Sequence, residues 1–151
     1  MFRGTNPINL DVKGRLAMPA RYRHQLEVEC GGSMIMTKDL FDPCLLLFPI
    51  NEWEVLETKL ASLSSTNRQH RAIKHILLGH ASDIELDKNH RFIVPPSLRQ
   101  LVGLKKHLYL VGNGKSFQVW DEESWHNQIS DDQALVMDQS LDPDQLPDLS
   151  F

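Results

Sequence analysis

The fold is decided by residues 8–23, INLDVKGRLAMPARYR, together with residues 84–99, IELDKNHRFIVPPSLR. When the second segment is placed under the first at an offset of 76 positions, six of sixteen residues are identical. A match of this quality indicates an internal duplication of the chain. The identical pairs are Ile8 and Ile84, Leu10 and Leu86, Asp11 and Asp87, Arg15 and Arg91, Pro19 and Pro95, and Arg23 and Arg99.

The duplication continues downstream with a slightly shorter loop. Residues 45–48 (LLLF) correspond to residues 117–120 (FQVW), and Trp53 corresponds to Trp125, now at an offset of 72. Each copy is predicted to form a strand, a tight turn, a strand, a short helix, a strand, a hairpin turn, a strand and a longer helix. The chain is therefore predicted to contain two similar β-rich halves.

The local patterns support these elements. Ile8 and Leu10 alternate with a polar residue, which is typical of a half-buried strand. The following residues 11–14 (DVKG) favour a turn, since the Asp side chain can bond backbone amides and Gly14 can adopt positive φ. Apolar residues at helical spacing predict a helical pair over about residues 51–79, between the copies. We expect a first domain at 5–52, a helical connector at 53–80, a second domain at 81–124, and a helix with an acidic tail at 125–151.

The charge of the chain is unevenly distributed. The net charge is -4, but residues 121–151 contain nine acidic residues and no Lys or Arg. Residues 1–120 hold the 16 basic residues against 11 acidic ones. A basic body with an acidic tail is typical of a protein with one face on phosphate, although solvated faces also carry such local excess. Beyond Ile129 we expect a loosely ordered acidic tail.

Several classes of protein are disfavoured. No apolar run is long enough to span a membrane, and no signal-peptide pattern opens the chain, so we expect a cytosolic protein. Cys30 and Cys44 form no CxxC pair and are expected to be reduced, buried thiols. Histidines five apart at 70, 75 and 80 scatter around a helix, which disfavours a metal site. No catalytic motif is present, so we expect no enzyme activity, cofactor or small-molecule substrate.

Particular stretches of the chain resemble the MraZ family. Residues 1–4 (MFRG), 10–16 (LDVKGRL) and 19–23 (PARYR) are similar to the N-terminal region of that family, and residues 77–82 (LLGHAS), 98–99 (LR) and 103–104 (GL) to later segments. The resemblance covers roughly residues 1–126. It is specific because the Asp-x-x-x-Arg turn occurs twice at the expected separation.

The resemblance implies an α+β fold of two tandem AbrB-like (SpoVT-AbrB) swapped-hairpin halves, joined by a helical pair and followed by an acidic C-terminal tail. It also implies a sequence-specific regulator of transcription that binds double-stranded promoter DNA and acts as a repressor. The implied targets are the bacterial division and cell-wall gene cluster and the regulator's own promoter, whose tandem repeats a multi-subunit ring would bind. The alternative is an AbrB-like module used only for protein oligomerisation, because a fold does not settle a function.

The candidate DNA-binding residues follow from the turn motif. They are Arg15, Lys13, Arg3 and Gly14, with Asp11 orienting Arg15, and more weakly Lys88 and Arg91 of the second copy. Arg15 could offer its guanidinium to a phosphate or a guanine edge, or it could only fix the turn through an ion pair with Asp11. The second turn has His90 where the first has Gly14. Either Asn89 takes the positive-φ position or the turn differs, and we expect DNA contact there to be weaker. For Arg23 and Arg99 we favour packing within the fold.

Overall fold

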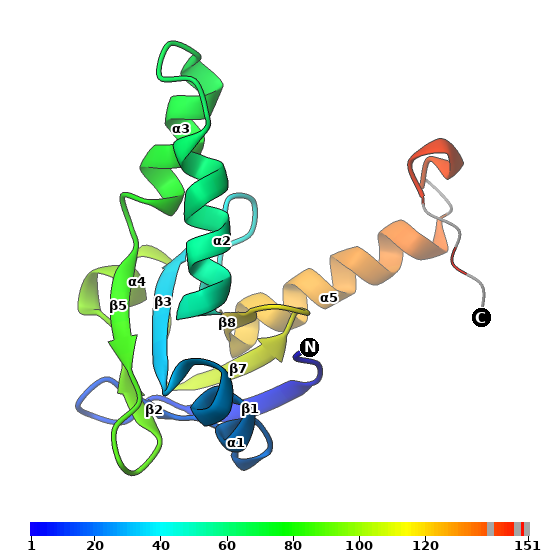
Figure 1. The fold of residues 1–151 in the computed structure, drawn as a ribbon. Helices are drawn as coiled ribbons and strands as arrows, with labels where there is room; N and C mark the ends of the chain where they lie inside the picture. The colour runs from blue at the N-terminus through cyan, green and yellow to red at the C-terminus, as the bar shows by residue number, and fades with distance from the viewer. Residues whose placement is uncertain (139–140, 147–148, 150–151) are drawn as a thin grey trace.

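The two copies fold into the same succession of elements, as a computed structural model of residues 1–138, 141–146 and 149 shows (Figure 1). The first copy contains β1 (Thr5–Asn9), β2 (Arg15–Ala17), α1 (Ala20–Cys30), β3 (Ser33–Lys38), β4 (Leu45–Pro49) and α2 (Ile50–Ala61). The second contains β5 (Ser82–Glu85), β6 (Arg91–Ile93), α4 (Pro96–Leu101), β7 (His107–Gly112), β8 (Phe117–Asp121) and α5 (Glu122–Met137). Between them lies α3 (Arg68–Leu77), and a short 3-10 turn spans Pro143–Gln145. The predicted α+β class with two β-rich halves is confirmed.

The strands of the two copies alternate in one antiparallel sheet of order β1-β7-β8-β4-β3-β5. β1 of the first copy pairs with β7 of the second, and β5 of the second pairs with β3 of the first. The counterparts in the two copies are β1 and β5, β3 and β7, and β4 and β8. If each strand is exchanged for its counterpart, the same strand order is obtained, read from the opposite edge of the sheet. The sheet therefore has a pseudo-twofold axis between β4 and β8. The exchanged first strands confirm the swapped-hairpin arrangement.

A separate two-stranded ribbon, β2 with β6, covers part of the core. Its register pairs Arg15 with Ile93, Leu16 with Phe92 and Ala17 with Arg91. Leu16 and Phe92 are 0% and 2% exposed and belong to the same hydrophobic core as the inward side chains of the sheet. Because side chains alternate along a strand, burying this central pair turns the flanking residues outward.

The helices extend from this core in two directions (Figure 1). α2 and α3 form a projection that is attached to the sheet where the hydroxyl of Thr37 donates to the backbone oxygen of Leu77 at 2.7 Å. α5 starts against the sheet, where Trp125 packs on Trp120 and Tyr109, and then leaves the body. The expectation of loose order beyond Ile129 is wrong as far as Met137, because the helix continues to that residue.

The apolar residues at helical spacing in the sequence do not all lie on the surface of the molecule. Trp53 and Leu60 on α2 are already buried by the chain's own strands. The large exposed apolar side chains include Phe41, 90% exposed in the loop between β3 and β4, and the last turn of α5. Within the described residues, no helix has both the length and the hydrophobicity needed to cross a membrane.

Candidate nucleic-acid interface

The first turn, between β1 and β2, is closed by its own aspartate. One carboxylate oxygen of Asp11 accepts hydrogen bonds from the backbone N–H groups of Lys13, at 2.9 Å, and Arg15, at 2.8 Å. Backbone bonds join Gly14 N–H to Asp11 O and Asp11 N–H to Arg15 O. Gly14 has a φ of +78°, which glycine adopts without steric cost. The turn is therefore a fixed platform, with the Lys13 side chain exposed on it.

The second turn repeats this geometry. Asp87 accepts from the N–H groups of Asn89 and Arg91, and the matching backbone bonds from His90 to Asp87 and from Asp87 to Arg91 are present. His90 has a φ of +59° and occupies the position of Gly14. Of the two alternatives for this turn, neither is observed: Asn89 does not take the positive φ, and the turn does not differ. Replacement of Gly14 by His90 therefore does not change the turn. The hydrogen bonds to Asp87 hold the second turn in the conformation of the first despite the strain at His90.

The two arginines that close the turns differ in their contacts. Arg15 Nε donates to the second carboxylate oxygen of Asp11 at 2.8 Å. Within the described part of the chain, the guanidinium of Arg91 makes no hydrogen bond or ion pair. The ion pair with Asp11 that could fix the turn is therefore present at Arg15, and it uses Nε. The two terminal nitrogens of Arg15 make no protein hydrogen bond among the described residues. Fixing the turn and offering a donor fork to a ligand are compatible roles for Arg15.

Both arginines lie on the outward side of the β2–β6 ribbon. Residues that face each other across an antiparallel pair share one side, so Arg15, Ala17, Arg91 and Ile93 all point away from the core. Ile93 is 58% exposed, and both arginines are half-buried. Together with Lys13 and Lys88 from the turns, these residues form a surface that we call the ribbon face.

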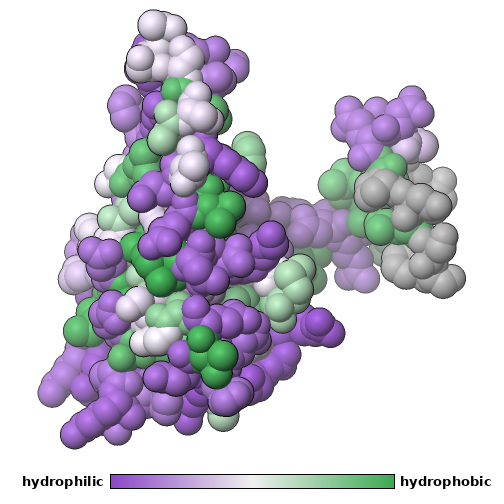
Figure 2. All heavy atoms as spheres, in the orientation of Figure 1, coloured by the Kyte–Doolittle hydropathy of each residue, from purple (hydrophilic) through white to green (hydrophobic). Residues whose placement is uncertain are grey.

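The ribbon ties the two turns together. The backbone N–H of Met18 donates to His90 O, and that of Val94 donates to Gly14 O, both at 2.9 Å. In Figure 1 both turns project at the lower left of the molecule, and the same end is covered by hydrophilic residues in Figure 2. Arg15 is close enough to the second turn to act electrostatically on Asp87. The ribbon face is therefore one continuous surface built from both copies.

Hydrogen bonding keeps the two turn aspartates charged. The backbone N–H of Arg15, followed by its side chain and the N–H of Lys13, lowers the pKa of Asp11 below 3.8. The backbone N–H of Arg91, followed by that of Asn89, likewise lowers the pKa of Asp87. Each carboxylate is occupied by donors from its own turn, whereas Lys13 and Lys88 are exposed and the terminal nitrogens of Arg15 make no hydrogen bond among the described residues. Such a surface attracts polyanions.

The surroundings of the two turns differ in charge. β5, which leads into the second turn, carries the exposed acids Asp83 and Glu85 where β1 has Pro7 and Asn9. The carboxylate of Glu85 accepts from the hydroxyl of Ser33. The first turn is therefore the more electropositive end of the ribbon face.

Comparison with known proteins places this geometry in a family. The family model described as "MraZ protein, putative antitoxin-like" matches residues 1–76 and again residues 77–143. The chain belongs to the MraZ family. Its relatives include proteins named "Transcriptional regulator MraZ" from Pseudomonas syringae pv. tomato, 48% identical over 99% of each chain, and from Idiomarina loihiensis, 51% identical over 87% of each chain. A third, from Pseudomonas fluorescens, is 47% identical over 99% of each chain. The repeated family match coincides with the two strand–turn–strand copies that build the ribbon face.

The structure of this MraZ family member does not bring Arg3 to the ribbon face. Arg3 lies beside Gly112 at the start of β1, whereas the first turn follows the end of that strand. Its backbone oxygen accepts from Arg21 and from the hydroxyl of Tyr22, which hold the N-terminal segment in place. Figure 1 shows the N-terminus on the opposite side of the molecule from the two turns. Arg3 is thus separated from the other candidate residues by the length of β1.

Two further arginines recur with the helices. Arg23 Nε donates to the backbone oxygen of Met18 at 2.9 Å, which is the packing role expected for it. Arg99 instead reaches the first turn, where its Nη1 lies 3.3 Å from the position a Cβ on Gly14 would occupy. Sequence reasoning also missed Ala17 and Ile93 on the ribbon face. Strand alternation at Leu16 and Phe92 could have identified them, once β2 and β6 were known to pair.

Other candidate chemistry is accounted for locally. Cys30 is half-buried and donates its thiol to the backbone oxygen of Leu26, and Cys44 is fully buried. Burial raises the pKa of both thiols, which keeps them protonated at neutral pH. Among residues 1–138, 141–146 and 149, no group of three or more His, Cys, Asp or Glu could hold a metal ion.

Proposed function

We propose that this member of the MraZ family is a transcriptional regulator that binds double-stranded promoter DNA through the ribbon face. The observation that carries the proposal is the convergence of two hydrogen-bonded turns, Lys13, Lys88 and two arginines on one exposed surface. The names of the relatives support regulation of transcription. Such a protein would act in the cytoplasm in association with the nucleoid.

Each proposed contact has a distinct role. Arg15, oriented by Asp11, offers its terminal nitrogens to a phosphate or to the two acceptors of a guanine in the major groove, which admits a two-stranded ribbon. Lys13 and Lys88 lie on the turns and neutralise phosphates without reading sequence. Gly14 is buried, so in this proposal it acts indirectly: its positive φ shapes the turn that presents Lys13 and Arg15. Arg91 contributes from the second turn, where Asp83 and Glu85 reduce the local positive potential.

Affinity in this proposal comes from many subunits. A multi-subunit ring would place one ribbon face on each of several tandem promoter repeats, so that modest contacts multiply on a single DNA. Occupation of those repeats would hinder the polymerase and repress the division and cell-wall gene cluster, including the regulator's own promoter. The exposed Phe41 and the exposed apolar residues Val136 and Met137 at the end of α5 are available for subunit contacts.

A protein-only oligomerisation module is the second candidate, and the same exposed apolar residues favour it. The two candidates differ in their response to salt. Binding of DNA by four cations should weaken steeply as ionic strength rises, because condensed counterions are released on binding. Association through apolar side chains should not weaken in this way.

The deciding experiment titrates Arg15→Ala, Arg91→Ala and Lys115→Ala against the DNA upstream of the chain's own gene. Lys115 is exposed and lies away from the ribbon face, so its substitution is a control for loss of one charge. At roughly 1 kcal/mol per contact, four engaged subunits would lose about a thousandfold in affinity with Arg15→Ala. Arg91→Ala should cost clearly less, about tenfold, and Lys115→Ala less than about threefold.

Circular dichroism and sedimentation of the variants separate binding from folding and assembly. Wild-type affinity for Arg15→Ala would contradict the DNA-contact role and leave only its ion pair with Asp11. Equal losses for Arg15→Ala and Arg91→Ala would show that both turns contact DNA alike. An unfolded Arg15→Ala would make this residue structural, and Lys13→Ala would then test the face.

A further inference from the structure

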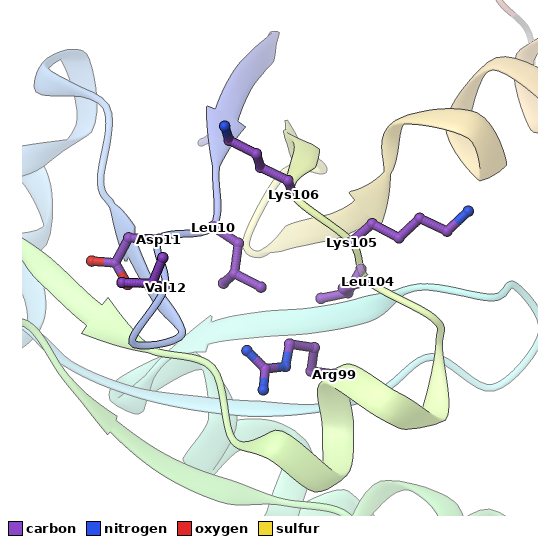
Figure 3. Close-up of a pocket in the computed structure, with 7 residues that line it drawn as sticks. All are labelled: Leu10, Asp11, Val12, Arg99, Leu104, Lys105 and Lys106. Carbon is purple, nitrogen blue, oxygen red and sulfur yellow. The ribbon is translucent and has the colours of Figure 1, made fainter.

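An open cavity of about 610 Å³ lies next to the first turn. It is bounded by the end of β1 and the turn on one side, and by α4 and the residues leading into β7 on the other (Figure 3). The cavity is within the range of volumes that hold small organic ligands. Its lining residues are Leu10, Asp11, Val12, Arg99, Leu104, Lys105 and Lys106.

The lining combines an apolar interior with a cationic edge. Leu10 and Leu104, each 8% exposed, turn toward each other in the middle of the cavity, and the guanidinium of Arg99 lies below them in Figure 3. Lys105 and Lys106 extend outward from the opposite edge. The ammonium of Lys105 is 3.6 Å from a Glu123 carboxylate, and both side chains are 75% exposed, so this ion pair is weak.

The acidic residue of the lining does not offset these cations. The carboxylate of Asp11 already accepts from Arg15 and from two backbone N–H groups, and in Figure 3 it points away from Leu104. Within the described part of the chain, the guanidinium of Arg99 has no hydrogen-bond partner. An incoming anion would therefore meet a half-buried arginine that is free to form a bidentate pair.

The pseudo-twofold counterpart of this cavity lacks its chemistry. At the first turn, the backbone N–H of Leu10 donates to Lys106 O. At the second turn, the equivalent N–H of Leu86 donates to Gly32 O. Gly32 therefore occupies the position of Lys106, and Gly31 that of Lys105. A Cβ on Gly32 would lie 3.2 Å from Leu86, which packs directly over that backbone. The two copies have thus diverged at this position, and only the end at the first turn has lysines beside an apolar interior.

We propose that this cavity binds a small amphipathic anion, with its apolar part between Leu10 and Leu104 and its carboxylate or phosphate on Arg99. We assign the ligand as an effector because the cavity lies directly beside the first turn of the ribbon face. The Nη1 of Arg99 lies 3.3 Å from the position a Cβ on Gly14 would occupy, so an anion that draws Arg99 into the cavity moves a side chain that lies beside the first turn. Binding at this site stands independently of whether the ribbon face binds DNA.

Octanoate is a suitable probe because it joins one carboxylate to an apolar chain. Its binding to the full-length protein is followed by NMR of the methyl groups of Leu10, Val12 and Leu104. We expect saturable shifts of these methyls, with 1-octanol and inorganic phosphate each at least about tenfold weaker, because either one supplies only half of the recognition. Arg99→Gln should weaken octanoate about tenfold through loss of a charge-assisted pair. The matched charge control, Lys115→Gln, should bind octanoate as the wild type does.

Specific outcomes would overturn the proposal. Equal binding of 1-octanol would reduce the site to an apolar groove, and equal binding of phosphate would reduce it to a basic surface. Absence of saturation, or wild-type affinity in Arg99→Gln, would also reject it. If Arg99→Gln is unfolded by circular dichroism, the exposed Lys106→Gln replaces it and should weaken octanoate at least about twofold. Unchanged affinity in that variant would overturn the proposal.

Discussion

Asp11 closes the first turn through three hydrogen bonds to its carboxylate, two from backbone N–H groups and one from Arg15. All three favour the ionised form, which is the reason the pKa of Asp11 is lowered below 3.8. A carboxyl with a lowered pKa in the folded state stabilises the fold at pH values above its unfolded value. That contribution is lost as the pH falls through the lower, folded-state pKa.

We therefore predict that the carboxyl carbons of Asp11 and Asp87 titrate below pH 3.8 in the folded protein, as measured by carbon-13 NMR. Asp11→Asn should be less stable than the wild type to urea above pH 3.8, since it cannot form the ion pair with Arg15. The difference should shrink as the pH falls through the folded-state pKa of Asp11. A folded-state midpoint at or above 3.8 would contradict the hydrogen bonding described for this turn.

Gly14 and His90 occupy equivalent left-handed positions, and they should respond to substitution with opposite signs. Gly14→Ala should destabilise the protein by about 1–2 kcal/mol, because a Cβ is strained at this φ and would approach Arg99. His90→Gly removes similar strain but adds freedom to the unfolded chain, so a net gain of about 0.5–1 kcal/mol is expected. Urea unfolding measures both, and a destabilised His90→Gly would show that the His90 side chain makes a compensating contribution.

At the level of elements, α5 has a packed start and an exposed end. Trp125 contacts Trp120 and Tyr109, whereas no residue of the helix is fully buried. The helix continues to Met137 because its sequence holds no Gly or Pro before that residue. Its acids should repel DNA rather than support the fold.

Deleting residues 131–151 should therefore leave DNA binding intact or make it stronger, since the deletion removes six aspartates and no Lys or Arg. The measurement is the same DNA titration, accompanied by sedimentation. Trp125→Ala is the contrasting change at the packed end, and it should lower stability by about 1–3 kcal/mol. Loss of DNA binding by the truncated chain with unchanged assembly would assign the tail a positive role in binding.

At the scale of the whole molecule, neither copy has its own sheet. β1 depends on β7, β5 depends on β3, and the ribbon requires one strand from each copy. The core residues Leu16 and Phe92 cover each other only when both copies are present. The copies are repeats in sequence, yet they share one hydrophobic core.

We predict that residues 1–80 alone do not fold as a monomer and that mixing them with residues 81–151 restores a cooperative thermal transition, followed by circular dichroism. As a control, cleavage of the folded protein at a protease site inserted near Ser64, in the exposed α2–α3 connection, should leave the two pieces associated. A cooperative, monomeric 1–80 fragment would show that one copy can complete a core by itself.

The element pattern of this chain was predictable from sequence because it depends on local physics. Alternating apolar residues, such as Ile8 and Leu10, predict strands regardless of the strands they pair with. Asp11 and Gly14 predict the turn that follows. The repeat at an offset of 76 residues predicts that the strands and turn of the first copy recur in the second. These signals were sufficient for the strand–turn–strand units and for the candidate residues on the first turn.

Tertiary structure decided which units meet. Strand pairing is a contact between residues about a hundred positions apart, such as Asn6 and Leu110, and no local pattern specifies that partner. Only the exchange of first strands places Arg15 and Arg91 on one face and leaves Arg3 at the far end of β1. Likewise, His90 adopts a strained φ because bonds to Asp87 and across the ribbon outweigh its intrinsic preference. The sequence by itself thus determined the repeated elements and their turns, and the shared core determined how the two copies combine into one surface.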